Sequence, residues 1–340
     1  MRFRATAALV LATVTALTAT ACRDSRTADG GPVRLMVGGI EKVIYLPAKL
    51  ADQLGYFRQE GLDVQLSTEP AGATAENSLI SGDVQGVVGF YDHTIDLQTK
   101  GKCIQSVVQM SDVPGEAEMV STRPDAPRSP AEFAGKRLGV TSPGSSTDFL
   151  TQALATRNGV DTHAYTTVKA GAGQTFIAAL TNGQIDGGMT TDPTINQLTS
   201  TGQGRILADM RTEDGTKAAL GGLYPSTSLY MECGYVAQHK QTAQKLANAL
   251  VKTLRYINTH SAEDIAAKMP PDYASGGRDL YVKSINDTKA MFNSDGKMKP
   301  EGARNVLDVL GESSPSVRPK KDQIDLSRTY TTEFVDRVAP

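Results

Sequence analysis

Tryptophan is absent from the 340-residue sequence, and basic residues do not outnumber acidic ones, with 35 Lys and Arg against 37 Asp and Glu. Without a basic cluster, this balance argues against a nucleic-acid partner. The four histidines are scattered without the spacing of metal ligands, so we expect neither a metal site nor a cofactor. Low-complexity tracts are missing as well. The 39% hydrophobic and 21% charged content therefore predicts a globular body with one large or two medium-sized cores.

Cysteine is also scarce, with three residues in the whole sequence. Cys103 and Cys233 stand in no Cys-x-x-Cys motif, which argues against a thiol-redox site. In an oxidising compartment two such residues often pair, whereas as free thiols they would pack as small buried apolar groups. The sequence fixes no distance between them, so it leaves a disulfide and two free thiols as alternatives.

The first 21 residues are typical of a signal peptide. Arg2 and Arg4 precede an uncharged run of small residues over 5–21, which suits the apolar region of a leader better than a membrane span. The motif Ala-Thr-Ala-Cys at 19–22 is similar to a bacterial lipobox, in which Cys22 is acylated and becomes the first residue. Ordinary cleavage that leaves Cys22 as a free thiol is the alternative. We expect export to the cell envelope, with 22–32 as a lipid tether to the membrane.

Strand-like and helix-like segments alternate after the tether, which predicts parallel sheets covered by helices. Alternating or continuous apolar runs predict strands at 33–37, 62–66, 84–90, 137–141, 165–168, 185–189 and 229–238. Apolar residues with helical spacing predict helices at 47–54, 74–82, 145–158, about 176–180, 246–257, 261–269, 277–292 and 300–310.

One pattern occurs twice and divides the chain into two similar lobes. Leu-x-x-Gly-x-Val-x-Gly over 79–86 returns as Leu-x-x-Gly-x-Ile-x-Gly over 180–187. Coincidence is the alternative, because a Gly between a helix and a strand is common in α/β proteins. Two irregular stretches, 112–130 and 202–226, are expected to hold the crossovers. We therefore predict lobe I at 33–120 plus 228–340 and lobe II at 121–227.

A Gly turn among serines at 142–146 is the clearest candidate binding loop. In α/β sheets, ligands bind beyond the carboxyl ends of the strands, and this loop follows such an end. The backbone N–H groups that open the next helix, with the hydroxyls of Ser142, Ser145 and Ser146, would attract an anionic or polar group. A plain helix N-cap explains one of these serines but not all three.

Two acidic and two aromatic residues stand at equivalent strand ends. Asp92 and Asp192 could bind amino or hydroxyl groups of a ligand, although Asp192 before a proline also suits a helix cap. Tyr45 and Tyr91 could form stacking walls or simply pack. Gly-x-Ser-x-Gly is absent, and no motif nominates a catalytic group, so we expect a protein that is not an enzyme.

The chain resembles the nitrate/sulfonate/taurine-type substrate-binding proteins of ABC importers, which include binders of thiamine pyrimidine precursors. The resemblance rests on short motifs that follow one another in the family's order, at 45–48, 55–57, 60–64, 82–84, 135–140, 144–146, 183–186 and 192–193.

This resemblance implies a two-lobed periplasmic-binding-protein fold of type II, in which two hinge crossovers join mostly parallel sheets. A monomer would capture a small polar or anionic solute (a sulfonate, nitrate, an organic acid or a pyrimidine) and deliver it to permease and ATPase subunits. Thr191 stands where the family often has Trp, and Tyr91-Asp92-His93 replaces a loop of small residues; both favour a ligand that is larger or carries nitrogen donors. By position, the cleft residues would be Tyr45, Tyr91, Asp92, Ser142, Ser145, Ser146 and Asp192.

Two alternatives have different functions. One is an enzyme like the pyrimidine synthases of related fold, but these carry a Cys-rich motif and are not exported. The other is a solute sensor that reports ligand occupancy to a membrane partner, which a neighbouring permease gene would argue against.

Overall fold

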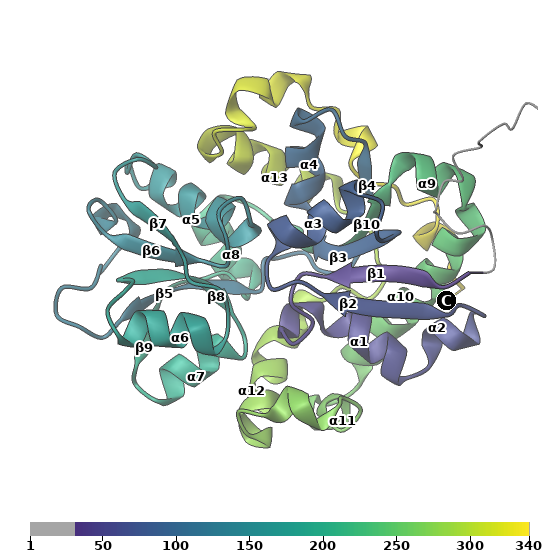
Figure 1. Cartoon of the computed structure of the whole chain (residues 1–340), viewed down its shortest axis with the longest axis horizontal. Helices are drawn as coiled ribbons and strands as arrows, with labels where there is room; N and C mark the ends of the chain where they lie inside the picture. The colour runs from purple at the N-terminus through teal and green to yellow at the C-terminus, as the bar shows by residue number, and fades with distance from the viewer. Residues whose placement is uncertain (1–30, 340) are drawn as a thin grey trace, which may run out of the picture.

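The computed structural model describes residues 31–339, and its strands form two separate five-stranded sheets, one in each lobe (Figure 1). Lobe I contains β1 (Val33–Val37), β2 (Val64–Thr68), β3 (Gly86–Phe90), β4 (Ile104–Gln109) and β10 (Thr227–Glu232). Lobe II contains β5 (Glu116–Ser121), β6 (Arg137–Val140), β7 (Thr166–Lys169), β8 (Gly187–Thr191) and β9 (Gly204–Asp209). The strand orders are β2-β1-β3-β10-β4 and β7-β6-β8-β5-β9. In each sheet one strand, β10 or β5, runs antiparallel to both neighbours, so the predicted mostly parallel α/β architecture is confirmed.

Helices cover both faces of each sheet, as expected for parallel strands joined by crossovers. In lobe I, α3 and α4 lie on one face, and α1 and α10 on the other; in lobe II, α5 lies opposite α6 and α7 (Figure 1). The helices of the first part of the chain are α1 (Leu46–Gln53), α2 (Tyr56–Gln59), α3 (Gly72–Ile80), α4 (Asp92–Thr99), α5 (Ser146–Arg157), α6 (Gln174–Thr181), α7 (Thr194–Ser200) and α8 (Glu213–Leu220).

The last third of the chain is largely helical, as the sequence predicts. Its helices are α9 (Cys233–Gln238), α10 (Lys240–Thr259), α11 (Ala262–Ala266), α12 (Arg278–Thr288) and α13 (Pro300–Ser313). Short 3-10 helices lie at η1 (Val43–Tyr45), η2 (Pro130–Glu132), η3 (Pro271–Ala274), η4 (Lys289–Met291), η5 (Arg318–Gln323), η6 (Leu326–Arg328) and η7 (Val335–Arg337). The predicted strand at 229–238 is only half right, because β10 ends at Glu232 and α9 follows at once.

The internal repeat is present in the fold. Gly82 and Gly183 both have a positive φ, 83° and 69°, where helix α3 or α6 turns into strand β3 or β8. Gln85 accepts a hydrogen bond from the backbone N–H of Arg34 on β1, and Asp186 accepts one from the corresponding N–H on β6. The two sheets therefore share their helix–Gly–strand joint, their strand order and a side-chain bond at the same place.

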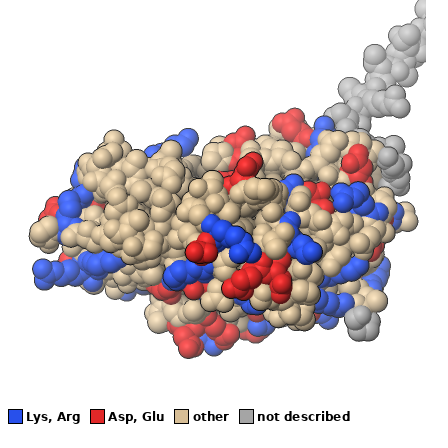
Figure 2. All heavy atoms as spheres, turned by 90° about the horizontal axis from the view of Figure 1, so that it is seen from below, with Lys and Arg blue, Asp and Glu red and all other residues tan. Residues whose placement is uncertain are grey.

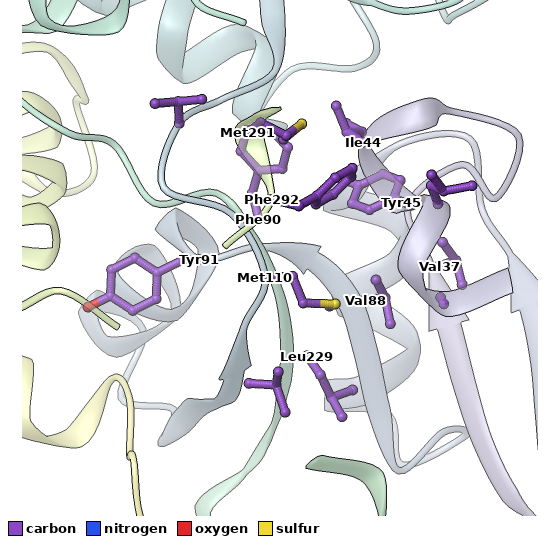
Figure 3. Packing of buried hydrophobic residues seen from close by; sticks show 14 of the residues in the cluster. Val37, Ile44, Tyr45, Val88, Phe90, Tyr91, Met110, Leu229, Met291 and Phe292 are labelled. Atoms are coloured by element: carbon purple, nitrogen blue, oxygen red, sulfur yellow. The ribbon is translucent and has the colours of Figure 1, made fainter. Parts of the chain in front are cut away.

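Two crossovers join the lobes. Residues 110–115 lead from β4 into β5, and residues 221–226 lead from α8 into β10. Since all of β5 pairs within the second sheet, the first crossover lies before Glu116, and the predicted boundary at residue 120 is too late. Apolar contacts run along one face of the lobe I sheet up to this hinge, where Met110, Phe292 and Tyr45 lie near Val88 and Leu229 (Figure 3).

Cys103 and Cys233 form a disulfide with a Cα–Cα distance of 5.5 Å. The bond links the start of β4 to the start of α9 across a sequence separation of 130 residues. The sequence leaves open whether Cys103 and Cys233 form a disulfide or remain free thiols, and the structure contains the disulfide. Cys22 and the predicted leader lie outside the described residues. Among residues 31–339, no helix is long and apolar enough to span a bilayer. On the face drawn in Figure 2, basic and acidic side chains lie beside one another.

Candidate functional site

The carboxyl ends of the parallel strands of the two sheets face each other across the lobe interface, which is where α/β proteins bind ligands. Direct hydrogen bonds cross this interface. The hydroxyl of Ser146 in lobe II donates to Oδ1 of Asp92 in lobe I at 2.8 Å, and the N–H of Ala73 donates to Oγ of Ser145 at 3.3 Å. The N–H of Val43 donates to the carbonyl of Asp192 at 3.1 Å. The structure thus has its lobes closed on each other, and it brings three of the candidate residues, Asp92, Ser145 and Ser146, to the lobe interface.

The donors of the serine loop are used by carboxylates of the chain itself. Gly144 N–H donates to Oδ2 of Asp148 at 2.9 Å, while Ser146 donates to Asp92. The hydroxyl of Ser142 is turned back to the Pro143 carbonyl. The predicted anion site at this helix terminus is therefore taken by Asp148 and Asp92. The Asp148 contact is local, whereas the Asp92 contact depends on the two lobes meeting and has no local signature.

Asp92 is fully buried and bound only by neutral donors. Its second oxygen accepts a hydrogen bond from the hydroxyl of Tyr224 at 2.9 Å. Burial raises the pKa of Asp92, while His93, Ser146 and Tyr224 act in the opposite direction. The residue anchors the interface at the first position of α4, where a negative charge also suits the helix dipole.

His93 lies between Ser146 and Glu76 in an order that resembles a serine hydrolase triad. Its Nε2 is 3.4 Å from the Ser146 hydroxyl, and its Nδ1 is 3.1 Å from Oε2 of Glu76. Burial opposes the positive charge, but Glu76 first and then Asp92 and Asp96 raise the pKa of His93 to about 9. A histidine that is protonated at neutral pH cannot take a proton from Ser146, and Ser146 already donates to Asp92. The geometry therefore fits a structural link better than a nucleophile.

Two glutamates that the sequence analysis missed lie on β5. Glu116 and Glu118 occupy alternate positions of the strand and so point to the same face of the sheet, and both are buried. Among the described residues, Oε2 of Glu116 and Oε1 of Glu118 have no hydrogen-bond partner, and Thr151 donates to the other oxygen of Glu118 at 3.3 Å. Burial raises the pKa of each glutamate to about 8; Lys42 acts against this shift at Glu116 and the Thr151 hydroxyl at Glu118.

Lys42 is the buried cation that faces these carboxyls, and the sequence analysis did not single it out. Its Nζ donates to the carbonyls of Gly38 at 2.8 Å and Pro70 at 2.9 Å, and within residues 31–339 no carboxylate forms an ion pair with it within 4 Å. Burial lowers its pKa, which Glu116 and Glu41 oppose. The ammonium group is thus held by neutral carbonyl groups, 6.0 Å from the centre of the Tyr45 ring.

The two tyrosines predicted for the cleft lie in different places. Tyr45 is buried at the hinge, packed edge-on against Phe90 with ring centres 6.4 Å apart. Tyr91 points away from Tyr45 and Phe90, into lobe I (Figure 3). There its hydroxyl is 2.5 Å from that of Thr329, and its ring lies edge-on to the ring of Tyr330. Tyr91 is therefore corrected from a cleft wall to a packing residue: it begins the turn into α4, which directs its side chain away from Phe90.

Asp192 acts as the helix cap that the sequence left as its alternative. Its Oδ1 accepts from the N–H of Asn196 in α7 at 3.1 Å, and its Oδ2 accepts from Arg211 at 2.9 Å and from Thr288 at 3.1 Å. Burial raises the pKa of Asp192, although Arg211 opposes the shift. With both oxygens bound within the protein, Asp192 joins α7, α12 and the end of β9.

A cavity of about 310 Å³ opens beside this interface. Lobe II contributes the first residues of α6 and α7, lobe I contributes Glu41 and Lys42, and the segment 272–281 closes one side with two tyrosines. Its volume falls at the lower end of the range for small-molecule sites. Lys42 lines this cavity and also acts on the carboxyl of Glu116, so the cavity and the buried cluster are neighbours.

The buried glutamates should make the unliganded protein less stable as the pH rises. Because Glu116 and Glu118 have folded-state pKa values near 8, above the usual 4.5, their contribution is fully present below pH 4.5 and lost through pH 8. His93, with a pKa raised to about 9, adds a loss of the same sign. We expect the free energy of unfolding, measured in urea, to fall between about pH 5 and about pH 8.

Replacing Glu116 with Gln should reduce this fall by at least about 1.4 kcal/mol, the equivalent of one pKa unit. Glu263→Gln, at an exposed position on α11, is the control and should leave the pH profile as in the wild type. Profiles that coincide for the wild type and Glu116→Gln would contradict the proposed burial of an ionisable group.

Comparisons with known proteins agree with this two-lobed fold. A solved structure from Bordetella bronchiseptica RB50 is 31% identical, with a TM-score of 0.85 over 90% of this chain and 96% of its own. The periplasmic aliphatic sulphonate binding protein SsuA from Escherichia coli shares the fold at 16% identity and a TM-score of 0.64, over 90% and 99% of the two chains. A candidate binding protein of Bacillus subtilis (strain 168), YtlA, is 22% identical over 251 residues, 73% of this chain and 72% of its own. Residues 45–263 match the family described as NMT1/THI5 like. The chain belongs to the NMT1/THI5-like family.

Proposed function

We propose that this protein is the extracytoplasmic substrate-binding component of an ABC importer, which captures a small solute between its lobes and delivers it to a permease. One observation carries the proposal: hydrogen bonds from Ser146 to Asp92 and from Ala73 to Ser145 join two lobes that are connected by two crossovers. A polar interface of this kind, at the carboxyl ends of two sheets, is what a hinged binding protein closes around its ligand.

Closure also explains how a permease would recognise the loaded protein. A solute that binds between the lobes stabilises the closed form relative to the open one, so occupancy is converted into a change of shape. Export follows from the predicted leader, and attachment at the membrane follows from acylation of Cys22; both belong to the proposal. The raised pKa of His93 argues against one catalytic role, that of a general base acting on Ser146 near neutral pH.

Thermal melts of the exported protein with sulfonates, nitrate, organic acids, pyrimidines and organic amines test this function. A true ligand at a hundredfold excess over its Kd should stabilise the protein by about 2.7 kcal/mol and raise the melting temperature. If the lobes close on it, Ser146→Ala should weaken its binding by about 1.5–3 kcal/mol, because a bond to a charged group is lost.

Ser200→Ala is the matched control, since this serine bonds only a neighbouring carbonyl on the exposed end of α7. Calorimetry should find its affinity unchanged. A library in which no compound stabilises the protein would refute the binding function, and a Ser146→Ala variant with wild-type affinity would refute closure through this contact.

A further inference from the structure

Buried carboxyl groups outnumber cations where the lobes meet. Asp92, Glu116 and Glu118 are each at most 3% exposed, and Lys42 is the buried cation that acts on Glu116. His93 is paired with Glu76 and so adds no net charge to the cluster. With all groups ionised, the three carboxylates would leave the closed interface with an excess of negative charge.

The remaining basic group near the interface is already bound. Arg211 donates to Asp209 and Asp192, at 2.7 and 2.9 Å, and lies 3.9 Å from Asp287. Lys42 is tied to two backbone carbonyls. No cation of the described interface is therefore left to receive a sulfonate, nitrate or carboxylate.

Glu116 is the first residue of β5, where the first crossover enters lobe II, and its carboxyl is unsatisfied there. It belongs to lobe II, yet the charges that act on its carboxyl, Lys42 and Asp92, belong to lobe I. Its Oε2 is buried without a hydrogen-bond partner. A buried acceptor without a partner is costly, and a donor supplied by a ligand would relieve that cost.

We infer that the solute is a small organic cation, whose ammonium or amidinium group is bound between the lobes by Glu116 and Asp92. The inference rests on the proposed function and narrows it to one charge class. In the unliganded protein, protons on Glu116 and Glu118 offset the excess negative charge near neutral pH. A bound cation can replace such a proton as the counter-charge and donate a hydrogen bond to the free oxygen of Glu116.

The neighbouring cavity suits the remainder of such a molecule. Tyr273 and Tyr281 line it with ring centres 6.3 Å apart, and Glu41 and Asp272 add two more carboxylates. Aromatic faces attract cations as well as apolar groups, so the cavity tolerates a second positive charge or a ring.

Cation binding should release protons, which gives the inference a second readout. Glu116 and Glu118 hold protons near neutral pH in the unliganded form, because burial raises their pKa values to about 8. A cation beside Glu116 lowers its pKa and ionises it. Titration calorimetry in two buffers of different ionisation enthalpy measures the protons released per solute bound.

The experiment compares putrescine, agmatine, benzamidine and choline with methanesulfonate, nitrate and benzoate, using melts of the exported protein at neutral pH. At least one cation should raise the melting temperature and release protons on binding, and no anion should do either. Glu116→Gln should weaken the binding of that cation at least tenfold and reduce the proton release. Glu263→Gln, on the exposed surface of α11, should bind and release protons as the wild type does.

The outcomes separate the two proposals. If an anion or a neutral pyrimidine stabilises the protein and no cation does, the charge assignment is wrong while the binding function stands. Cation binding that is unaffected by Glu116→Gln and releases no proton would also overturn the assignment. If no compound of any class binds, the binding function itself fails.

Discussion

Replacing Arg211 with Met should destabilise the protein by about 3–5 kcal/mol, as expected when one partner of a buried ion pair is removed. The Asp192 carboxylate that it pairs with is completely buried. Without the guanidinium group, two carboxylates are left without their cation, and the approach of Arg211 to Asp287 on α12, at 3.9 Å, is lost as well. Urea unfolding of the wild type and the variant measures the difference.

Arg123→Met is the matched control. Arg123 also bridges an aspartate at 2.9 Å, but a third of its side chain is exposed, at the edge of lobe II. Its loss should cost less than about 1 kcal/mol. Adding Asp192→Asn to Arg211→Met should restore part of the stability, because the uncompensated charge is removed. Equal losses for the two arginine variants, or no recovery in the double variant, would contradict this account.

Removing the Cys103–Cys233 disulfide should cost about 2–4 kcal/mol, through its effect on the unfolded chain. The bond closes a loop that includes the whole of lobe II. When it is absent, the unfolded chain has more conformational entropy than the oxidised unfolded chain, which favours unfolding. The double substitution to Ala should therefore unfold at lower urea concentration than the wild type.

Thiol counting provides the direct check. The denatured but unreduced wild type should show neither Cys103 nor Cys233 as a free thiol. Cys103→Ala alone should expose one thiol, at Cys233, and be about as unstable as the double variant. Two reactive thiols at these positions in the wild type would show that the pair does not form in solution.

Much of the fold could be predicted because its signals are local. The alternation of apolar runs gave β1, β3, β6 and β8, and the repeated helix–Gly–strand joint indicated two lobes before any contact was known. The error at 229–238 has a local cause too. The apolar character continues past Glu232, and nothing in that run shows that the chain changes from strand to helix there.

The site was harder to predict because its chemistry depends on which residues meet across the lobes. Asp92 and Ser146 were chosen from strand ends and do meet. Tyr91 was chosen for the same reason, but its side chain leaves in the opposite direction. Glu116 and Glu118 were passed over because the segment read as irregular. Their spacing by two in a stretch of small and apolar residues is the signal that could have identified a buried strand with acidic side chains.

The position of the crossovers has a consequence for the modularity of this chain. Every strand of the second sheet lies in one uninterrupted stretch, from β5 to β9, whereas the first sheet is assembled from both sides of it. The chain leaves and re-enters lobe I at adjacent points, where the N–H of Met110 donates to the carbonyl of Thr227 at 2.8 Å. Lobe II is thus an insertion whose ends already touch. The side chains that lobe II contributes to the lobe interface can therefore be exchanged between relatives as a single inserted unit, with lobe I left intact.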